Sequence, residues 1–282
     1  MDNHLLGRIR ARYNTFSSSQ QQVADYVLSH ADTVMMSSLS DFAKACGVSE
    51  PTIMRFLRKL DCDSYQVFRV GIAQELAHGS AENIYEEVSE EDTQAMIRDK
   101  VIHHTVRSLE DAKEIIDAAA LDHLVEMIRG ARRTLVIGIG ASSAIAFDCY
   151  HKLVRLGLTA IYENDPHMIN ILTSGLGPHD LMIAITHSGE SREILDAAAI
   201  ARDRGCPVAA VTSYPSSSIA RLASCLLLSS SLETRYRSDA LTSRIIQMTI
   251  TDMIYTSLAL RLGDSAQIQV DRSRVAVAKN KT

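Results

Sequence analysis

Two stretches of the sequence decide the fold of its C-terminal half: Leu135-Val-Ile-Gly-Ile-Gly-Ala-Ser-Ser143 and Leu181-Met-Ile-Ala-Ile-Thr-His-Ser-Gly-Glu-Ser191. In each stretch, an apolar run leads directly into a loop of small and hydroxylated residues, and a helical pattern follows the loop. Continuous apolar runs that alternate with helices predict a parallel sheet. Both loops then lie at the carboxyl ends of their strands, where open α/β folds bind ligands.

The composition of the two loops points to an anion. Glycine and alanine let the backbone approach a ligand closely, and the N–H groups of the helix start and the serine hydroxyls are available as donors. The loops are separated by one crossover and one strand. This spacing indicates a single phosphorylated ligand that both loops hold.

The rest of the C-terminal half continues the alternation of strands and helices. Further strands are expected over 158–162, 208–212 and 225–228, and a third serine-rich loop covers 213–218. A long helix over 243–262 and a mixed tail end the chain. The pattern predicts a doubly wound α/β domain with about five parallel strands.

Composition limits the class of protein. The 282 residues are 46% hydrophobic and 22% charged, with a formal net charge of −5, which is typical of a globular chain of about two domains. The sequence contains no apolar stretch of membrane-spanning length and no basic-then-apolar segment at its start. The five cysteines form no CxxC pair, so we expect buried thiols in a reducing cytoplasm and no structural metal.

The N-terminal half contains a helix-turn-helix pattern between Ser40 and Leu60. Ser40 is a candidate cap for one helix and Ser49 for the next, which has a proline in its first turn. A small Ala43, a turn Gly47 and a branched Ile53 are the residues that two closely crossing helices need. We therefore predict an all-α DNA-binding domain with double-stranded operator DNA as its partner.

The exposed side of the second helix supplies the candidate DNA contacts. In this motif the start of the second helix meets base edges in the major groove, while neighbouring hydroxyls and cations bind phosphates. Base reading is assigned to Glu50, Thr52 and Arg55, and phosphate contacts to Arg58, Lys59 and Ser38, with the capping Ser49 also in the DNA-facing set.

An acidic segment separates the two halves. Residues 81–100 contain seven acidic and two basic side chains, a shift in composition that marks a solvated linker. An amphipathic helix over 92–118 is expected to pack on the second domain or across a dimer. Its adjacent His103 and His104 point in different directions and do not suit a shared metal. The predicted boundaries are 1–79, 80–120, 121–265 and a tail over 266–282.

Two other readings of the loops are weaker. Gly138-x-Gly140-x-x-Ser143 approximates a dinucleotide fingerprint, with Glu163 near the position of a ribose-binding acid. A dinucleotide site has no need of the second serine loop, however. Ser188 lacks the Gly-x-Ser-x-Gly elbow of a hydrolase, and His187 is its sequence neighbour.

The paired loops and the third serine cluster resemble the SIS (sugar isomerase) domain. Over residues 1–265 the chain resembles the RpiR/MurR family of bacterial transcriptional regulators, and its segment Val48–Leu60 is similar to that family's recognition helix. The chain departs from the family pattern in two places. Asp61-Cys-Asp-Ser64 replaces a Gly-Phe-Lys-Gly-like turn, which puts a phosphate contact from that turn in doubt, and Ser191 replaces a common threonine but keeps the hydroxyl.

The resemblance implies roles for individual residues. Thr186, Ser188 and Ser191 would hold the phosphate, helped by the backbone of Gly189 and Glu190. In the first loop, which includes Gly140, Ser142 would reach a sugar hydroxyl and Ser143 would assist. Further candidates are His187 as a ligand contact or orienting group, Asp165 and His167 at the open side of the site, and Glu233 at the place where SIS enzymes keep a catalytic carboxylate.

A regulator fits the sequence better than an enzyme. Aldose–ketose isomerisation needs a base and a ring-opening group. Glu233 is a candidate base, but no histidine follows His187. We therefore expect a cytoplasmic, homodimeric or homotetrameric regulator of carbohydrate genes that senses a phosphorylated sugar, has no cofactor and is not an enzyme. A sugar-phosphate isomerase is the alternative.

Overall fold

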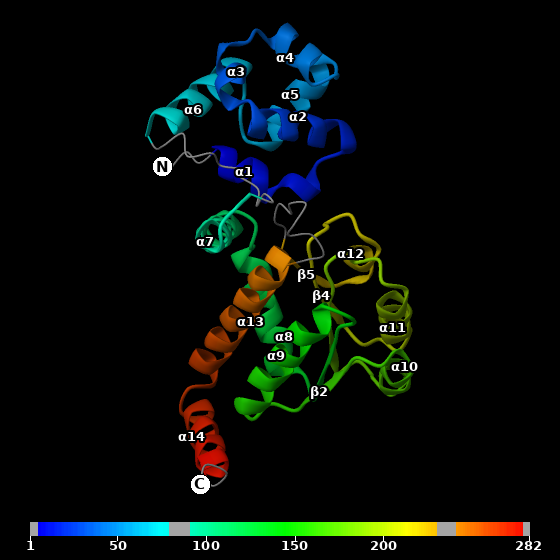
Figure 1. Ribbon diagram of the computed structural model, residues 1–282. Coiled ribbons are helices and arrows are strands. Elements are labelled where there is room, and N and C mark those ends of the chain that lie inside the picture. Colours follow the sequence, from blue (N-terminus) through cyan, green and yellow to red (C-terminus); the bar gives the residue numbers. More distant parts are fainter. Residues whose placement is uncertain (1–4, 79–90, 230–240, 279–282) are drawn as a thin grey trace. The chain divides into compact units, whose positions relative to one another are not determined.

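Residues 5–78, 91–229 and 241–278 are described by the computed structural model (Figure 1). The chain divides into two units, one of which comprises the N-terminal helices up to Ile115. The other comprises 116–229 together with the residues from Ser243 onward. Each unit has its own buried apolar core, so each is described by itself.

The N-terminal unit is entirely helical over its described residues. Its core is a cluster of aromatic and aliphatic side chains around Phe42, Phe56 and Phe68, all fully buried. The elements are α1 (Leu5–Ala11), a 3-10 turn (Tyr13–Thr15), α2 (Ser18–Ser29), α3 (Ala31–Met36), α4 (Leu39–Ala45), α5 (Glu50–Lys59), α6 (Tyr65–His78) and α7 (Gln94–Ala112).

Helices α4 and α5 form the predicted helix-turn-helix. Gly47 has φ of +66°, and the N–H of Val48 donates to the carbonyl of Ala43 at 3.0 Å, which closes α4 in the left-handed cap typical of glycine. One detail differs from the sequence prediction. Ser38, and not Ser40, is the N-cap of α4, since its hydroxyl accepts from the N–H of Asp41.

Helix α7 begins and ends within the predicted range 92–118. Thr93 caps its start, where its hydroxyl accepts from the N–H of Met96. The helix belongs to the N-terminal unit, and the guanidinium of Arg10 on α1 donates to Asp111 at 2.7 Å. The expected packing on the second domain or across a dimer stays a prediction. The ion pair between Arg10 and Asp111 joins the carboxyl end of α7 to α1. No sequence pattern predicted this pair.

The second unit contains one sheet of five parallel strands, as predicted. The strands are β1 (Thr134–Ile137), β2 (Ala160–Glu163), β3 (Leu181–Ile185), β4 (Val208–Thr212) and β5 (Cys225–Leu228), in the order β2-β1-β3-β4-β5. Every residue of β1, β3 and β4 is buried. Apart from Thr134 at the start of β1 and Thr212 at the end of β4, their sequences are apolar, which follows from burial on both faces of the sheet.

Helices cover both faces of the sheet (Figure 1). On one face, alternate strand residues such as Leu135, Met182 and Ala210 form a core with the helices α10 (Pro166–Ser174), α11 (Arg192–Asp203) and α12 (Ser218–Leu222). The other face is covered by α8 (Ala118–Gly130), α9 (Ser142–Arg155) and α13 (Leu241–Leu262).

Two elements of this unit differ from the sequence prediction. Strand β2 begins at Ala160 and not at Leu158, because the N–H of Leu158 closes α9 by donating to the carbonyl of Leu153, with Gly157 at φ of +83°. The residues after 265 were expected to be a tail. They form α14 (Asp264–Ala278), which buries Ala266 and Val270.

The five cysteines are buried and unpaired thiols, as expected. Burial raises the pKa of Cys46 and Cys149 to about 12, so neither thiol is a reactive thiolate at neutral pH. Among the described residues, no helix combines the length and the apolar character needed to span a membrane.

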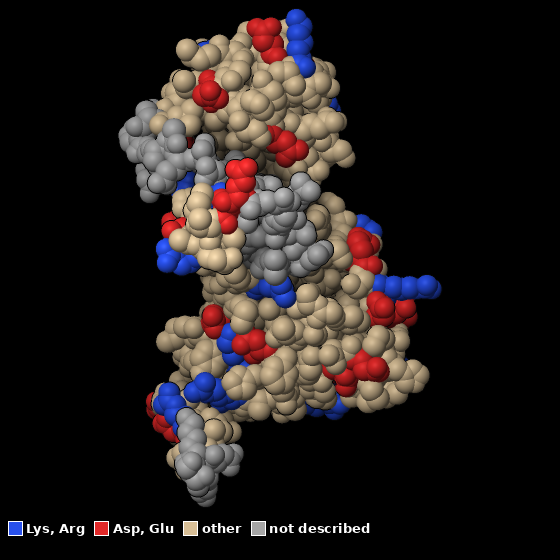
Figure 2. Space-filling view, in the orientation of Figure 1, with Lys and Arg blue, Asp and Glu red and all other residues tan. Residues whose placement is uncertain are grey.

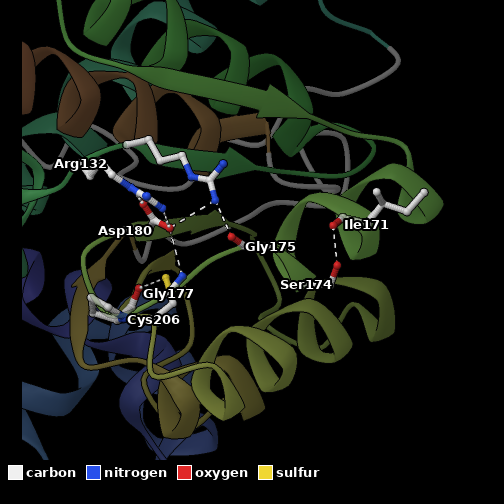
Figure 3. Close-up of polar contacts among 9 residues, drawn as sticks. Arg132, Ile171, Ser174, Gly175, Gly177, Asp180 and Cys206 are labelled. Carbon is white, nitrogen blue, oxygen red and sulfur yellow. Dashed lines mark hydrogen bonds and ion pairs between the residues drawn. The ribbon is translucent and has the colours of Figure 1, made fainter.

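A buried carboxylate fastens the amino ends of two central strands (Figure 3). Asp180, just before β3, accepts two hydrogen bonds from Arg132, just before β1, at 3.0 and 2.9 Å. Arg133 and the N–H of Gly177 donate to the same carboxylate at 3.3 and 3.0 Å. The bonds from Arg132, then those from Arg133 and Gly177, hold the pKa of Asp180 below its ordinary value.

We predict that Asp180→Ala lowers the free energy of unfolding by about 2–3 kcal/mol at neutral pH. This predicted loss of stability is smaller than the loss expected for a fully buried ion pair, because the Arg132 side chain faces solvent. Since the folded pKa is depressed, the contribution is present above the ordinary carboxyl pKa of about 4 and is lost as the pH falls below it. Urea unfolding at about pH 7 and about pH 3 measures both effects.

The matched control is Asp196→Ala, which removes an exposed carboxylate from α11 of the same unit. It should change the free energy of unfolding by less than about 0.5 kcal/mol. An Asp180→Ala deficit that is the same at both pH values would contradict the assigned ion pair.

Candidate functional site

The strand order brings the two serine loops together. From β1 the chain moves outward to β2, then crosses back to β3 and continues in the opposite direction to β4 and β5. Strands β1 and β3 are therefore neighbours at the point where the winding reverses, which is where open α/β sheets bind ligands. The loop after β1 and the loop after β3 both lie at this position.

The first loop is tightly turned. Gly140 has φ of +59°, and both the N–H and the hydroxyl of Ser143 bond to the carbonyl of Gly140, at 3.1 and 2.7 Å. Ser142 is the first residue of α9 and is 7% exposed. The hydroxyl of Ser143 is thus used within the loop, whereas Ser142 begins the helix whose N-terminus faces the site.

The second loop partly satisfies its own donors. The N–H of Gly189 donates to the hydroxyl of Thr186 at 3.3 Å, and the N–H of Glu190 donates to the hydroxyl of Ser188 at 3.2 Å. Both contacts are long for hydrogen bonds to N–H. Ser191 is the N-cap residue of α11, yet its hydroxyl accepts no bond from the first turn of that helix, all of which the structure describes. A phosphate can replace these weak internal acceptors.

A third loop supports the second, and sequence reasoning assigned it no residue roles. Gly189 has φ of +69°, and a Cβ there would lie 2.4 Å from the hydroxyl oxygen of Ser217. Glu190 accepts from the N–H of Ser218 at 2.7 Å, and the bonds from Ser218 lower the pKa of that carboxyl. The only sequence signal was the serine-rich run after the fourth strand. Glycine is required at 189 because its φ is positive and the side chains of Ser217 and Ile219 occupy the space that a Cβ would take.

His187 faces the third loop with one nitrogen. Its Nδ1 lies 2.9 Å from the hydroxyl oxygen of Ser213, and its ring meets that of Tyr214 edge-on at 5.4 Å between centroids. Two bonds hold its carbonyl, from the hydroxyl of Thr212 and the N–H of Ser213. The surrounding contacts fix the orientation of the residue within the loop.

The acidic residues near the end of β2 have local structural partners. Asp165 caps α10 by accepting from the N–H of Met168 at 2.9 Å. Glu163 accepts from the N–H groups of Asn164 and Asp165, so its carboxylate folds back onto its own loop. His167 is exposed on the first turn of α10. Glu233 lies outside the described residues, so its predicted role stays a prediction.

No group of three or more histidine, cysteine or acidic residues suited to a metal ion occurs among the described residues. His103 and His104 lie with ring centroids 6.1 Å apart at an interplanar angle of 75°. The expectation that the protein uses no cofactor remains a prediction.

The candidate DNA contacts lie along α5 of the N-terminal unit. Glu50, Arg55 and Arg58 are exposed, and the core-facing Ile53, Phe56 and Leu57 are fully buried. The hydroxyl of Thr52 forms a hydrogen bond with the hydroxyl of Ser49 at 3.0 Å. It also accepts one from the guanidinium of Arg55 at 3.2 Å. These three polar groups at the start of α5 form a cluster that a base edge can enter.

Two of the predicted phosphate contacts have partners within the protein. The ammonium of Lys59 donates to the carbonyl of Thr15 at 2.7 Å and lies over the ring of Phe16. The hydroxyl of Ser38 donates to the carboxylate of Asp41 at 2.6 Å while it caps α4. Both residues have a structural function in α5 and α4. Arg58 is exposed at the end of α5.

The turn after α5 explains how an aspartate occupies a position that favours glycine. Asp61 has φ of +56°, and the N–H of Cys62 donates to the carbonyl of Leu57, which is the glycine-type helix ending. Its carboxylate pairs with Arg12 at 3.2 Å and Arg8 at 3.6 Å. The pairing reduces the negative charge that this turn presents to DNA.

The charge on the face of the N-terminal unit drawn in Figure 2 does not by itself mark a nucleic-acid binder. On the face of that unit drawn in Figure 2, acidic and basic side chains lie in small separate groups. The DNA-binding signal identified in the structure is the helix-turn-helix of α4 and α5.

Comparison with known proteins agrees with the two units. The family model described as the helix-turn-helix domain of the rpiR family matches residues 3–79, and the SIS domain model matches residues 127–257. An HTH-type transcriptional regulator of Thermotoga maritima is 36% identical, and the alignment covers 98% of this chain and 99% of that one. The regulator HexR of Pseudomonas aeruginosa is 30% identical over 95% of this chain and 94% of its own.

A solved structure is similar over almost the whole chain. The Vibrio vulnificus NanR protein complexed with ManNAc-6P is 28% identical with a TM-score of 0.62, and the match covers 98% of each chain. The chain therefore belongs to the rpiR family of helix-turn-helix transcriptional regulators with a SIS domain. The family resemblance noted in the sequence is confirmed.

We predict that Gly189→Ala distorts the second serine loop. An alanine there combines a positive φ with a clash against Ser217, so the free energy of unfolding should fall by about 2 kcal/mol and phosphate binding should be lost. Urea unfolding and calorimetric titration with inorganic phosphate measure the two effects. Gly130→Ala, with open space around its Cβ, is the control and should change neither. Unchanged phosphate binding in Gly189→Ala would contradict the site.

We predict different effects for two basic residues of α5. Arg55→Ala should weaken operator binding by about 1–3 kcal/mol, because its guanidinium is exposed on α5 and donates to Thr52 in the first turn of that helix. Lys59→Ala should instead destabilise the N-terminal unit by about 1 kcal/mol and change DNA affinity by less than about twofold. Arg98→Ala removes an exposed cation on α7 and serves as the control. Equal losses of DNA affinity in all three variants would indicate a nonspecific effect of charge.

Proposed function

We propose that this chain is a DNA-binding regulator of carbohydrate genes whose SIS domain senses a phosphorylated sugar. The observation that carries the proposal is the meeting of two serine loops at the β1–β3 switch point, in a chain whose N-terminal unit is a helix-turn-helix. The first feature suits a phosphate monoester and the second suits operator DNA.

The chemistry of the loops supports a phosphate. The start of α11 is surrounded by the hydroxyls of Thr186, Ser188 and Ser191. Ser142 begins α9, the helix that follows the neighbouring strand β1. Two helix N-termini and several short hydroxyl side chains suit an anion without requiring a cation. NanR, which is similar over 98% of the chain, is complexed with a phosphosugar, and we extend that ligand class to this site.

A regulatory role accounts for the site better than catalysis. Isomerisation needs a ring-opening group, and the His187 ring is engaged with Ser213 and Tyr214. Two relatives that match almost the full chain are named transcriptional regulators. We therefore propose that the protein is not an enzyme and that it acts in the cytoplasm, where its DNA partner is found.

The proposed mechanism is thermodynamic linkage between the two ligands. Homodimers or homotetramers would place paired α5 helices on an approximately palindromic operator. A phosphosugar would bind one arrangement of the assembly more tightly than the other. The factor by which it changes DNA affinity cannot exceed the ratio of its own affinities for the two arrangements.

The direct experiment measures DNA binding by fluorescence anisotropy. The fragment upstream of the chain's own gene is titrated at two salt concentrations, with and without a panel of sugar phosphates. We expect specific binding that weakens with salt and shifts with one sugar phosphate. Absence of specific binding across genomic fragments, with turnover of a sugar phosphate, would overturn the proposal in favour of an isomerase.

The double variant Ser188→Ala, Ser191→Ala tests the division of labour. It should abolish the response to the sugar phosphate and leave DNA binding without effector within about twofold, because it removes hydroxyls only from the SIS loop. Ser174→Ala is the matched control, since its hydroxyl bonds to the carbonyl of Ile171 outside the site (Figure 3). Equal loss of DNA binding in the double variant would contradict the separation of the two functions.

A further inference from the structure

Helix α14 extends away from the sheet of its own unit (Figure 1). One face of the helix carries four residues at helical spacing: Ala266, Val270, Ser273 and Val277. Ala266 and Val270 are 2% and 6% exposed, because this face packs on the unit, but Val277 is 55% exposed. The packing face of α14 therefore continues beyond the surface of its own unit.

The outer part of α14, residues 271–278, is called the arm. Every arm residue except Ser273 is exposed, and Val275 and Val277 are each more than half exposed. A helical segment of this length has little stability by itself in water, since isolated helices shorter than about 12–15 residues are marginal. Its branched valines lower the helix propensity further. An exposed apolar helix end of this kind is suited to packing against a partner.

An exposed aromatic cluster lies at one edge of the sheet. Phe147 and Tyr150 of α9 and Tyr162 of β2 have ring centroids 5.4 to 6.1 Å apart, and we call these three residues the aromatic corner. Strand β2 is an outermost strand of the described sheet, and Phe147 is more than half exposed. A large aromatic ring that is open to solvent beside two others is typical of an interaction surface.

The arm of the same chain begins far from the aromatic corner. Helix α14 meets the turn that ends α9, where a Cβ at Gly157 would lie 2.9 Å from the side chain of Gln269. Phe147 lies about 12 Å from that end of α9, by the rise of an α-helix. Two copies of the chain with antiparallel α9 helices would bring the arm of each copy to the corner of the other.

The charges of the two surfaces are complementary. The arm contains Arg272 and Arg274 against one acidic residue, Asp271. Glu163 borders the corner directly after Tyr162, and an exposed aspartate follows at 165. A basic and apolar helix end thus matches an acidic and aromatic edge. Pairing of one arm with another would instead bring like charges together, which is unfavourable.

We propose that the arm of α14 docks on the aromatic corner of a second copy of this chain, which returns its own arm in the same way. Under two-fold symmetry the contact occurs twice, so the apolar area removed from water is doubled. This inference rests on the homo-oligomer of the proposed function and specifies one of its contacts. Its tests need neither DNA nor a sugar phosphate, so they are decided independently of both ligands.

Photocrosslinking from the arm tests which surfaces meet. Val277→Cys introduces an exposed thiol that a benzophenone maleimide labels selectively, because the five native thiols are buried. The labelled full chain is equilibrated with ¹⁵N-labelled wild type, irradiated and analysed by mass spectrometry. We expect crosslinks that join the two isotopic forms and map to residues 144–165. Crosslinks only within one chain, or only to other segments, would overturn the proposal.

The matched crosslinking control is Val67→Cys on α6, because the exposure of Val67 is similar to that of Val277. It carries the same label at a position outside the arm and the corner, and it should give no crosslink to residues 144–165 of another chain. Equal crosslinking to that segment from both positions would indicate random collision and would overturn the assignment.

Sedimentation velocity over a range of protein concentrations measures the strength of the contact. Val275→Glu combined with Val277→Glu should weaken self-association by about tenfold or more, since two carboxylates would be buried against aromatic rings. Both valines are exposed in the single chain, so folding should be unchanged. Phe147→Ala removes the exposed ring of the receiving surface and should weaken self-association in the same direction.

The matched charge control is Val67→Glu combined with Val70→Glu, which adds two carboxylates to exposed positions of α6. It should change self-association by less than about twofold. A wild type that is monomeric at every concentration, or an arm variant that associates as tightly as the wild type, would overturn the proposal. Absence of phosphate or DNA binding by the wild type would instead count against the proposed function, while sedimentation and crosslinking still decide the role of the arm.

Discussion

Burial of both faces of the parallel sheet is the constraint on which the rest of the SIS domain depends. Strands β1, β3 and β4 are buried throughout, so helices must cover both faces and the winding must reverse once. That reversal falls between β1 and β3 and brings two distant loops to one edge. At the opposite edge, Asp180 and its arginines fasten the same two strands.

Contacts within the protein hold the second loop. The hydroxyls of Thr186 and Ser188 accept from the N–H groups that a phosphate would use, while Gly189 fits against Ser217 at a positive φ. At the proposed site, a phosphate would therefore exchange weak internal bonds for charge-assisted ones and would have little chain to order. In the proposed mechanism, this exchange would leave most of the binding energy available to select one arrangement of the proposed assembly.

Much of the fold followed from local sequence. Apolar runs identified the strands, and the Ala43, Gly47 and Ile53 spacing identified the helix-turn-helix, because these signals lie within one or two elements. Features that depend on distant partners did not. Local sequence does not predict that Lys59 contacts Thr15, 44 residues away. Nor does it predict that the N–H of Leu158 closes a helix, where a strand was expected to begin.

The same limit applies to the candidate site. The serine loops were visible as sequence, but their adjacency depends on strand order, which is set by long-range pairing. The partners Ser213 and Tyr214 of His187 come from the loop after β4, which no local pattern links to the loop after β3. The roles of the loop residues and of the α5 residues stay predictions, and so do the boundaries between the domains.

Reciprocal linkage tests the central claim, that one assembly binds DNA and a phosphosugar with coupled energies. The affinity of the responding sugar phosphate would be titrated with the protein free and with the protein saturated by operator DNA. The account predicts a change equal to the factor by which that sugar phosphate alters operator affinity. Equal sugar-phosphate affinities in the two titrations, despite specific binding of both ligands, would contradict it.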